Sequence, residues 1–87
     1  MKLNEIIEEI KNYQNLSKHK SALDIYRLLD NNNRLFSEKM EEGDLSGLLT
    51  GFEALAYADP KEYTTPAYQN DYEKMYGLLL YHLNKIV

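Results

Sequence analysis

The fold is decided by the last part of the chain, which reads TPAYQNDYEKMYGLLLYHLNKI over residues 65–86. Its large apolar side chains recur every three or four residues, which places them along one face of an α-helix. They are Tyr68, Tyr72, Met75, Tyr76, Leu79, Leu83 and Ile86. Thr65 is typical of a helix N-cap and Pro66 of the first helical residue. The segment therefore predicts a helix from Pro66 to about Lys85 with one buried face.

Three earlier segments repeat this spacing, and we expect a helix in each. They cover residues 3 to about 13–15, residues 21 to about 42, and residues 45 to 58. Helices joined by short connections pack side by side in alternating directions. Together with the last helix they predict an all-α fold, an antiparallel four-helix bundle, in a single domain over residues 1–87. No segment alternates with a period of two for long enough to indicate a β-strand.

Short polar segments mark the expected corners between these helices. The first turn is expected over residues 14–20, with Ser21 as a weak capping signal for the second helix. Gly43 suits a left-handed C-cap, and Asp44 suits the N-cap of the third helix. A proline ends the third helix, because it cannot continue one and restricts the residue before it. Residues 59–65 therefore form the last connection.

Three consecutive asparagines, residues 31–33, interrupt the second helix. Asparagine competes with helical backbone hydrogen bonds and favours caps and turns. Leu29 and Phe36 nevertheless stay in phase across the interruption, so we expect one long helix that is bent there. Two short helices that meet at the asparagines are the alternative.

Small residues form a second stripe on the third helix: Gly47, Gly51, Ala54 and Ala58. Two glycines inside a helix cost about 1 kcal/mol each relative to alanine. They are explained if another helix passes unusually close to this face. The sequence leaves open whether that helix belongs to the same chain or to a second copy in a homodimer.

Composition limits the classes of function. The chain has 87 residues, no cysteine and a formal net charge of −4. An acidic chain gains little counterion-release energy from nucleic acid, and its one local basic cluster, Lys18-His19-Lys20, is short. The longest strongly apolar run, Leu78–Tyr81, is far below the roughly 20 residues that span a bilayer. We therefore expect a cytoplasmic protein without a transmembrane segment and without nucleic-acid binding.

Residues that could carry chemistry are scarce. His19 lies in a lysine-flanked loop and His82 at the edge of the apolar stripe of the last helix, with no motif that joins them. No paired histidines or Glu-x-x-His spacing indicates a metal site, and no glycine-rich loop indicates a phosphate site. We expect no catalytic, metal-binding or cofactor-binding residue, so the protein is not predicted to be an enzyme.

Four acidic residues gather at the second expected corner: Glu38, Glu41, Glu42 and Asp44. The simplest interpretation is a solvated helix end, and binding of a basic peptide is the functional alternative. Except for Asp44, these carboxylates would lie at a helix C-terminus. There they would oppose the helix dipole at a cost of up to about 1 kcal/mol.

Tyrosine is strongly enriched, with eight tyrosines against two phenylalanines and no tryptophan. Four of them, Tyr26, Tyr68, Tyr72 and Tyr76, lie on apolar stripes, where each can bury its ring and hydrogen-bond its hydroxyl at the edge. The others fit the stripes less well, and exposed tyrosines are enriched at protein interfaces. The candidate partner-binding residues, on the last connection and the outer face of the last helix, are Tyr57, Tyr63, Tyr81, His82 and Lys85.

The order of these features resembles that of a known family. A short amphipathic helix precedes a long one, followed by LLTGFEALAYA over residues 48–58 and YGLLLYHL over residues 76–83. The pattern resembles the immunity proteins that protect producers of pediocin-like (class IIa) bacteriocins, although many members of that family are basic and this chain is acidic. The resemblance covers nearly the whole chain and rests on helix order and stripe positions.

The resemblance implies a cytosolic four-helix bundle that binds the bacteriocin on its receptor and blocks the pore. The receptor is the membrane component of the mannose phosphotransferase system, so peripheral membrane association is compatible with this role. In the family the C-terminal half selects the bacteriocin, which corresponds here to residues 59–65 and the last helix. The alternative is a helical interaction or regulatory module, of phage or toxin–antitoxin type, that forms a homodimer or binds a partner helix.

Overall fold

The computed structural model describes residues 2–12 and 18–86, without the side chains of residues 18 and 19. Within this part of the chain every regular element is helical and no strand occurs. Four helices have nine or more residues, and two short elements lie between them. In chain order the elements are α1 (Leu3–Lys11), α2 (Lys18–Asn31), α3 (Asn33–Ser37), α4 (Glu42–Ala56), the 3-10 helix η2 (Pro60–Glu62) and α5 (Pro66–Ile86).

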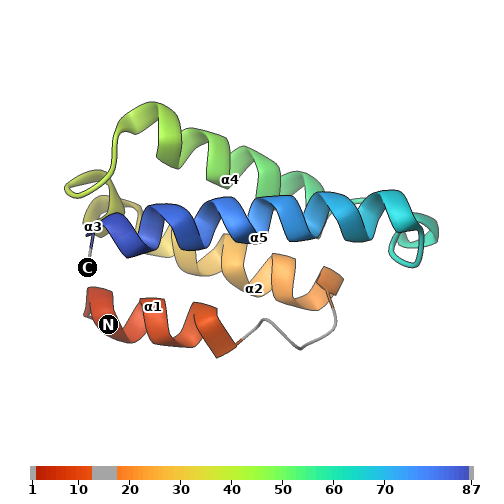
Figure 1. Cartoon of the computed structure of the whole chain (residues 1–87), viewed down its shortest axis with the longest axis horizontal. Helices are drawn as coiled ribbons and strands as arrows, with labels where there is room; N and C mark the ends of the chain where they lie inside the picture. The colour runs from red at the N-terminus through yellow and green to blue at the C-terminus, as the bar shows by residue number, and fades with distance from the viewer. Residues whose placement is uncertain (1, 13–17, 87) are drawn as a thin grey trace.

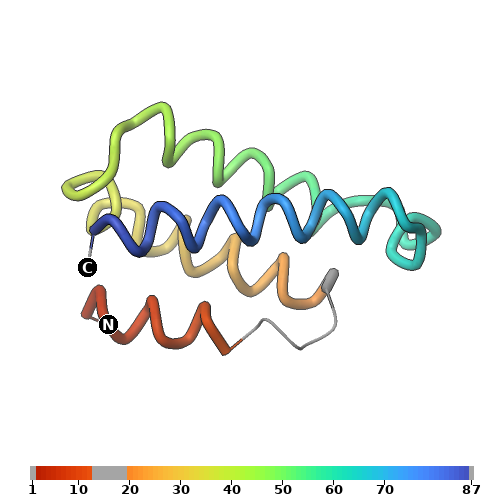
Figure 2. The backbone as a smooth tube through the Cα atoms, in the orientation of Figure 1, coloured from red at the N-terminus to blue at the C-terminus, as the bar shows by residue number. Residues whose placement is uncertain are grey.

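The long helices lie side by side along the longest dimension of the molecule, which measures 36 × 24 × 20 Å (Figure 1). In this view α1 and α4 run in one direction, and α2 and α5 run in the other. The backbone trace shows that both ends of the described chain lie at the same end of the molecule as α3 (Figure 2). α2 packs most extensively on α4, and α5 contacts both of them.

The apolar stripes predicted from the sequence meet in one core, which confirms the helical spacing. α1 contributes three isoleucines, and α5 contributes three tyrosines together with Leu79 and Leu83. The largest fully buried side chains are Phe36, Phe52, Ile6, Ile10, Ile25, Leu29, Leu48, Leu79 and Leu83. Burying one such side chain stabilises the fold by about 1.5–3 kcal/mol relative to leaving it in water.

The predicted start of the last helix is confirmed in atomic detail. The Thr65 hydroxyl accepts a hydrogen bond from the backbone N–H of Tyr68 at 3.2 Å, and donates one to the carbonyl of Glu62 at 2.7 Å. Pro66 is the first helical residue, and α5 continues to Ile86, one residue beyond the predicted end. Before it, the Asp59 carboxylate accepts from the backbone N–H of Lys61 at 2.9 Å, which starts η2.

The second helix differs from the prediction because it is broken rather than bent. Asn32 leaves the helical conformation, with φ −115° and ψ 24°, and separates α2 from α3. Its side-chain amide donates to the carbonyl of Leu28 at 2.8 Å, the kind of local bond with which asparagine competes against a helix. The alternative of two helices that meet at the asparagines is therefore the correct one.

Two other predicted boundaries are wrong. Helix α2 begins at Lys18, so Ser21 is a fully buried residue inside the helix and not its cap. The second corner lies at residues 38–41, because α3 ends at Ser37. Gly43 is consequently not a left-handed C-cap but part of the first turn of α4, and no described glycine has a positive φ. The predicted turn over residues 14–20 is wrong for residues 18–20, which belong to α2. Its residues 14–17, and an end of the first helix beyond residue 12, lie outside the described residues.

This shift reverses the expected electrostatics of the acidic corner. Glu41 is the residue before α4, and Glu42 and Asp44 lie in its first turn. Carboxylates are stabilising at a helix N-terminus, where the dipole is positive. Asp44, which was predicted to be the N-cap, is instead the third residue of α4. Only Glu38, at the end of α3, keeps the unfavourable position that the sequence predicted.

The two glycines of α4 have different environments. A Cβ atom added to Gly51 would overlap the thioether of Met75 on α5, whose sulfur would be 2.8 Å away. At Gly47 nothing lies within 4 Å of such an atom. The prediction of a close approach is therefore confirmed for Gly51, where α5 of the same chain fills the space. At Gly47 no described residue of the chain makes such an approach, and an approach by a second copy stays a prediction.

Candidate partner-binding surfaces

Three of the five candidate residues lie together near the C-terminal end of α5. Tyr81 is 55% exposed, and its ring centre lies 5.4 Å from that of His82 at an interplanar angle of 72°. The Lys85 Nζ lies 4.3 Å from the centre of the Tyr81 ring, on its face. Such a cation–π contact is worth about 0.5–1 kcal/mol at an exposed site. We call Tyr81, His82 and Lys85 the Tyr81 surface.

The Tyr81 surface extends onto the start of α4. The Nδ1 atom of His82 lies 3.9 Å from a carboxylate oxygen of Asp44, and the His82 side chain is mostly buried. The neighbouring Tyr81 raises the pKa of Lys85, and the negative charges of Asp44 and Glu41 add to this effect. A cavity of about 340 Å³ beside Tyr81 is lined by Asp44, His82 and Lys85 among others. The surface therefore combines an exposed aromatic ring with charges of both signs.

The other two candidate residues lie at the opposite end of α5. Tyr57 follows α4 and is 66% exposed, and its ring meets that of Tyr26 edge to face, with ring centres 6.2 Å apart. Tyr63 is only partly exposed, because it packs on Tyr68 with ring centres 5.4 Å apart. At 1.5 Å per residue, about 22 Å of helix separates the start of α5 from Tyr81. The five candidate residues therefore form two separate surfaces.

The tyrosines on the apolar stripe of α5 have structural roles. The hydroxyl of Tyr68 donates to the carbonyl of Leu55 at 2.6 Å, and that of Tyr76 donates to the carbonyl of Ile10 at 2.8 Å. Tyr72 stacks on Tyr76 with ring centres 5.9 Å apart. Burial raises the pKa of all three, that of Tyr68 to about 12. These rings tie α5 to α4 and α1, as their position on the stripe predicted.

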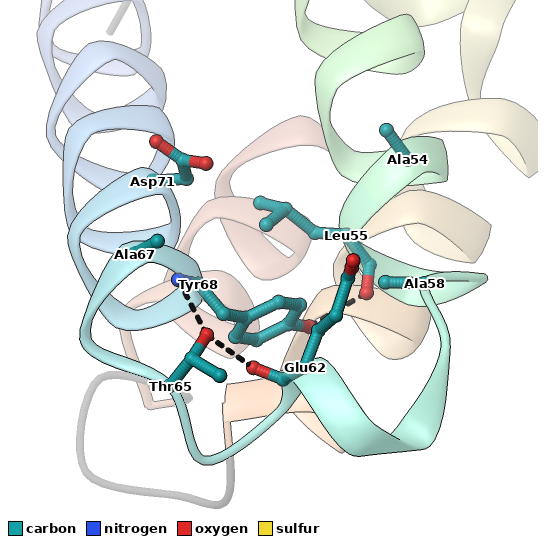
Figure 3. Close-up of a pocket in the computed structure, with 8 residues that line it drawn as sticks. All are labelled: Ala54, Leu55, Ala58, Glu62, Thr65, Ala67, Tyr68 and Asp71. Carbon is teal, nitrogen blue, oxygen red and sulfur yellow. Dashed lines mark hydrogen bonds between the residues drawn. The ribbon is translucent and has the colours of Figure 1, made fainter.

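The structure also contains a site that the sequence interpretation did not identify. A groove of about 490 Å³ runs between the end of α4 and the start of α5 (Figure 3). Its lining includes three alanines: Ala54 on α4, Ala58 just after the end of α4, and Ala67 on α5. The stripe of small residues on the third helix was the available signal. We call this site the α4–α5 groove.

We also looked at the described residues for a metal site and for a helix that could cross a membrane. No three His, Cys, Asp or Glu side chains there are close enough together to hold a metal ion. The side chain of His19 is outside the described part. None of the described helices combines the length and apolar character needed to cross a bilayer.

No protein-family model, no curated protein and no solved structure matches the chain. The surfaces just described and the resemblance in helix order are therefore the basis on which a function is proposed.

Proposed function

We propose that this protein is an antiparallel four-helix bundle that acts as a bacteriocin immunity protein. In this role it stays in the cytoplasm of the producing cell and binds a bacteriocin on its membrane receptor, the mannose phosphotransferase component. The proposed activity is binding and involves no catalytic residue or cofactor. The resemblance described above supplies the identity of the target, and the Tyr81 surface supplies the place of contact.

The observation that carries the proposal is the exposure of Tyr81 on the outer face of α5. Leaving more than half of a tyrosine ring in water gives up most of the stabilisation that its burial would supply. The ring is held in place by Lys85 and His82, so little side-chain entropy remains to be lost when a partner covers it. An aromatic ring beside a cation is typical of residues that contribute most to protein interfaces.

A homodimer through the small-residue face of α4 has less support. Met75 of the same chain already covers Gly51, so the face offers no continuous strip for a second helix. A sedimentation measurement at several concentrations distinguishes the two proposals. The immunity role does not require self-association, whereas the alternative requires a dimer that a larger residue at Gly47 disrupts.

The proposed function is tested by expressing the gene in a bacterium that is sensitive to pediocin-like peptides. Cells are challenged with a panel of such peptides, and the protein level is measured by immunoblot. We expect increased survival against at least one peptide and loss of this protection with Tyr81→Ala. Lys20→Ala is the control, because it removes an exposed side chain near the start of α2, outside the C-terminal half of the chain. Sensitivity to every peptide despite normal expression would contradict the proposal.

A further inference from the structure

The α4–α5 groove has an apolar lining. Ala54 and Ala58 form one wall, Ala67 forms part of the other, and the ring of Tyr68 lies between them (Figure 3). The hydroxyl of Tyr68 is occupied by its bond to the carbonyl of Leu55, so this part of the lining offers no free hydrogen-bonding group. A groove of this kind fits an unbranched aliphatic chain better than a polar one.

Two carboxylates flank this apolar lining. Glu62 extends from η2 along the α4 side, and Asp71 projects from the α5 side (Figure 3). Both residues are exposed, and neither carboxylate forms an ion pair or hydrogen bond with a side chain in the described part of the chain. The neighbouring Thr65 hydroxyl does not neutralise them, because it is bonded to backbone groups. The groove therefore carries two uncompensated negative charges beside an apolar lining.

We infer that the α4–α5 groove binds an arginine or lysine side chain of a cationic segment in a partner protein. Long basic side chains lay their methylene groups on apolar surface and keep the charged group at its edge. The alanines provide the surface for the methylene groups, and the carboxylates of Glu62 and Asp71, one on each side of the groove, would pair with the cation. Hydrogen bonds between a guanidinium and carboxylates are among the stronger polar contacts in proteins.

Charge also argues against other occupants of the groove. Nucleic acid and anionic lipid would be repelled by the two carboxylates. A second copy of the chain brings its own net charge of −4, which opposes association. This inference does not depend on the immunity role, because it uses only the groove and its charges.

The experiment is a titration of the full-length ¹⁵N-labelled protein with acetylated hexa-arginine amide, followed by two-dimensional NMR. The same peptide built from citrulline is the neutral probe of equal shape. We expect saturable shifts of backbone amides around Ala54, Ala58 and Ala67 with the arginine peptide and none with the citrulline peptide. Because exposed ion pairs are individually weak, removing both carboxylates in Glu62→Gln/Asp71→Asn should raise the Kd about fivefold.

Two further variants test whether the peptide binds in the α4–α5 groove. Ala54→Leu fills the groove from an exposed position without changing charge, and should also weaken binding. Glu5→Gln/Glu8→Gln removes two exposed charges of α1, away from the groove, and should change the Kd by less than about twofold. NMR spectra of the variants verify that each is folded.

Three results would overturn the inference. Equal weakening by both double variants would mean that only net charge matters. Equal shifts with the citrulline peptide would mean that the cation is not recognised. Self-association that disappears in Glu62→Gln/Asp71→Asn would identify a second copy of the chain as the occupant.

Discussion

Tyr72 and Tyr81 lie on the same helix, but they are used in opposite ways. Tyr72 is 2% exposed, stacks on Tyr76 and meets Phe52 edge to face with ring centres 6.4 Å apart. Tyr81 is mostly exposed, and its ring contacts His82 and Lys85, which are near neighbours on α5. A helix turns about 100° per residue, so the position of each tyrosine relative to the apolar stripe determines its environment. The tyrosine enrichment of the chain therefore reflects two requirements, one for packing and one for a surface.

The two glycines of α4 show the same contrast between covered and uncovered positions. Gly51 makes room for Met75, whereas the space beside Gly47 is open. A glycine inside a helix can thus be explained by packing at one position and not at another. Four measurements test how far this contrast between inner and outer positions extends.

The largest effect is expected for Tyr72→Ala. Removing a buried aromatic ring usually costs about 3–5 kcal/mol. That is a large part of the total stability of a chain of 87 residues, which should be about 4–13 kcal/mol. Urea unfolding followed by circular dichroism measures the loss. Tyr81→Ala is the outer counterpart and should change the free energy of unfolding by less than about 1 kcal/mol. Equal losses for both variants would refute the contrast.

The inner tyrosines should also make stability depend on alkaline pH. Burial raises the pKa of Tyr68 to about 12, and its neighbours Tyr63 and Tyr72 add to the rise. The folded state then holds this proton more tightly than the unfolded state, whose tyrosines have a pKa near 10. This stabilisation is complete below about pH 10 and is lost as the pH rises through 12.

Urea unfolding between pH 8 and 12 measures this dependence. The free energy of unfolding should fall above about pH 10, and that of the Tyr68→Phe variant should fall less steeply. Some dependence should remain in that variant, because burial also raises the pKa of Tyr72 and Tyr76. Parallel curves for the two proteins would show that ionisation of Tyr68 does not contribute.

A smaller effect is expected for Tyr76→Phe, which keeps the buried ring and removes only the hydroxyl. This hydroxyl donates to the carbonyls of Ile10 and Lys11 at 2.8 and 3.3 Å, at the end of α1. Leaving such acceptors unsatisfied costs about 1–3 kcal/mol. The loss should be concentrated in α1, because a helix of nine residues is not stable alone.

Hydrogen exchange of backbone amides locates this loss. Exchange in α1 should accelerate more than exchange in α4. Tyr68→Phe is the control, because it removes an equally buried hydroxyl that bonds to α4 instead. Uniform acceleration in both helices would mean that the Tyr76 hydroxyl does not hold α1 specifically.

Helix positions and most of the core could be predicted from the sequence, but several boundaries could not. The spacing of Leu79 and Leu83 indicates a buried face whatever the exact helix ends are. Boundaries depend instead on single local bonds, such as the one from the Asn32 side chain to the carbonyl of Leu28. Thr65 was predictable because an N-cap followed by proline is a strong signal. Gly43 was misleading because glycine is compatible with a helix C-cap and with a first turn.

The candidate surfaces were predictable in part. The outward position of Tyr81 follows from its angle on the helix, and the structure places His82 and Lys85 beside it. Tyr63 was different, because the ring of Tyr68 covers it across a corner whose path no periodicity describes. The α4–α5 groove was missed for a similar reason. Its width depends on how closely two helices approach, and the alanines of one helix do not specify that distance.

The smallest effect is expected for the glycines of α4. Gly47→Ala places a methyl group in open space, so it should raise the free energy of unfolding by about 0.5–1 kcal/mol through helix propensity. Gly51→Ala has the same intrinsic gain, but its methyl group must displace the end of the Met75 side chain. Methionine is flexible and can move, at the cost of some packing. Gly51→Ala should therefore stabilise the protein less than Gly47→Ala does, or destabilise it slightly, as measured by thermal unfolding.

Each of the two variants adds one methyl group to the same helix. Equal gains in stability would therefore show that the contact with Met75 carries no measurable energy. A larger gain at Gly51 would reverse the contrast between covered and uncovered positions on α4.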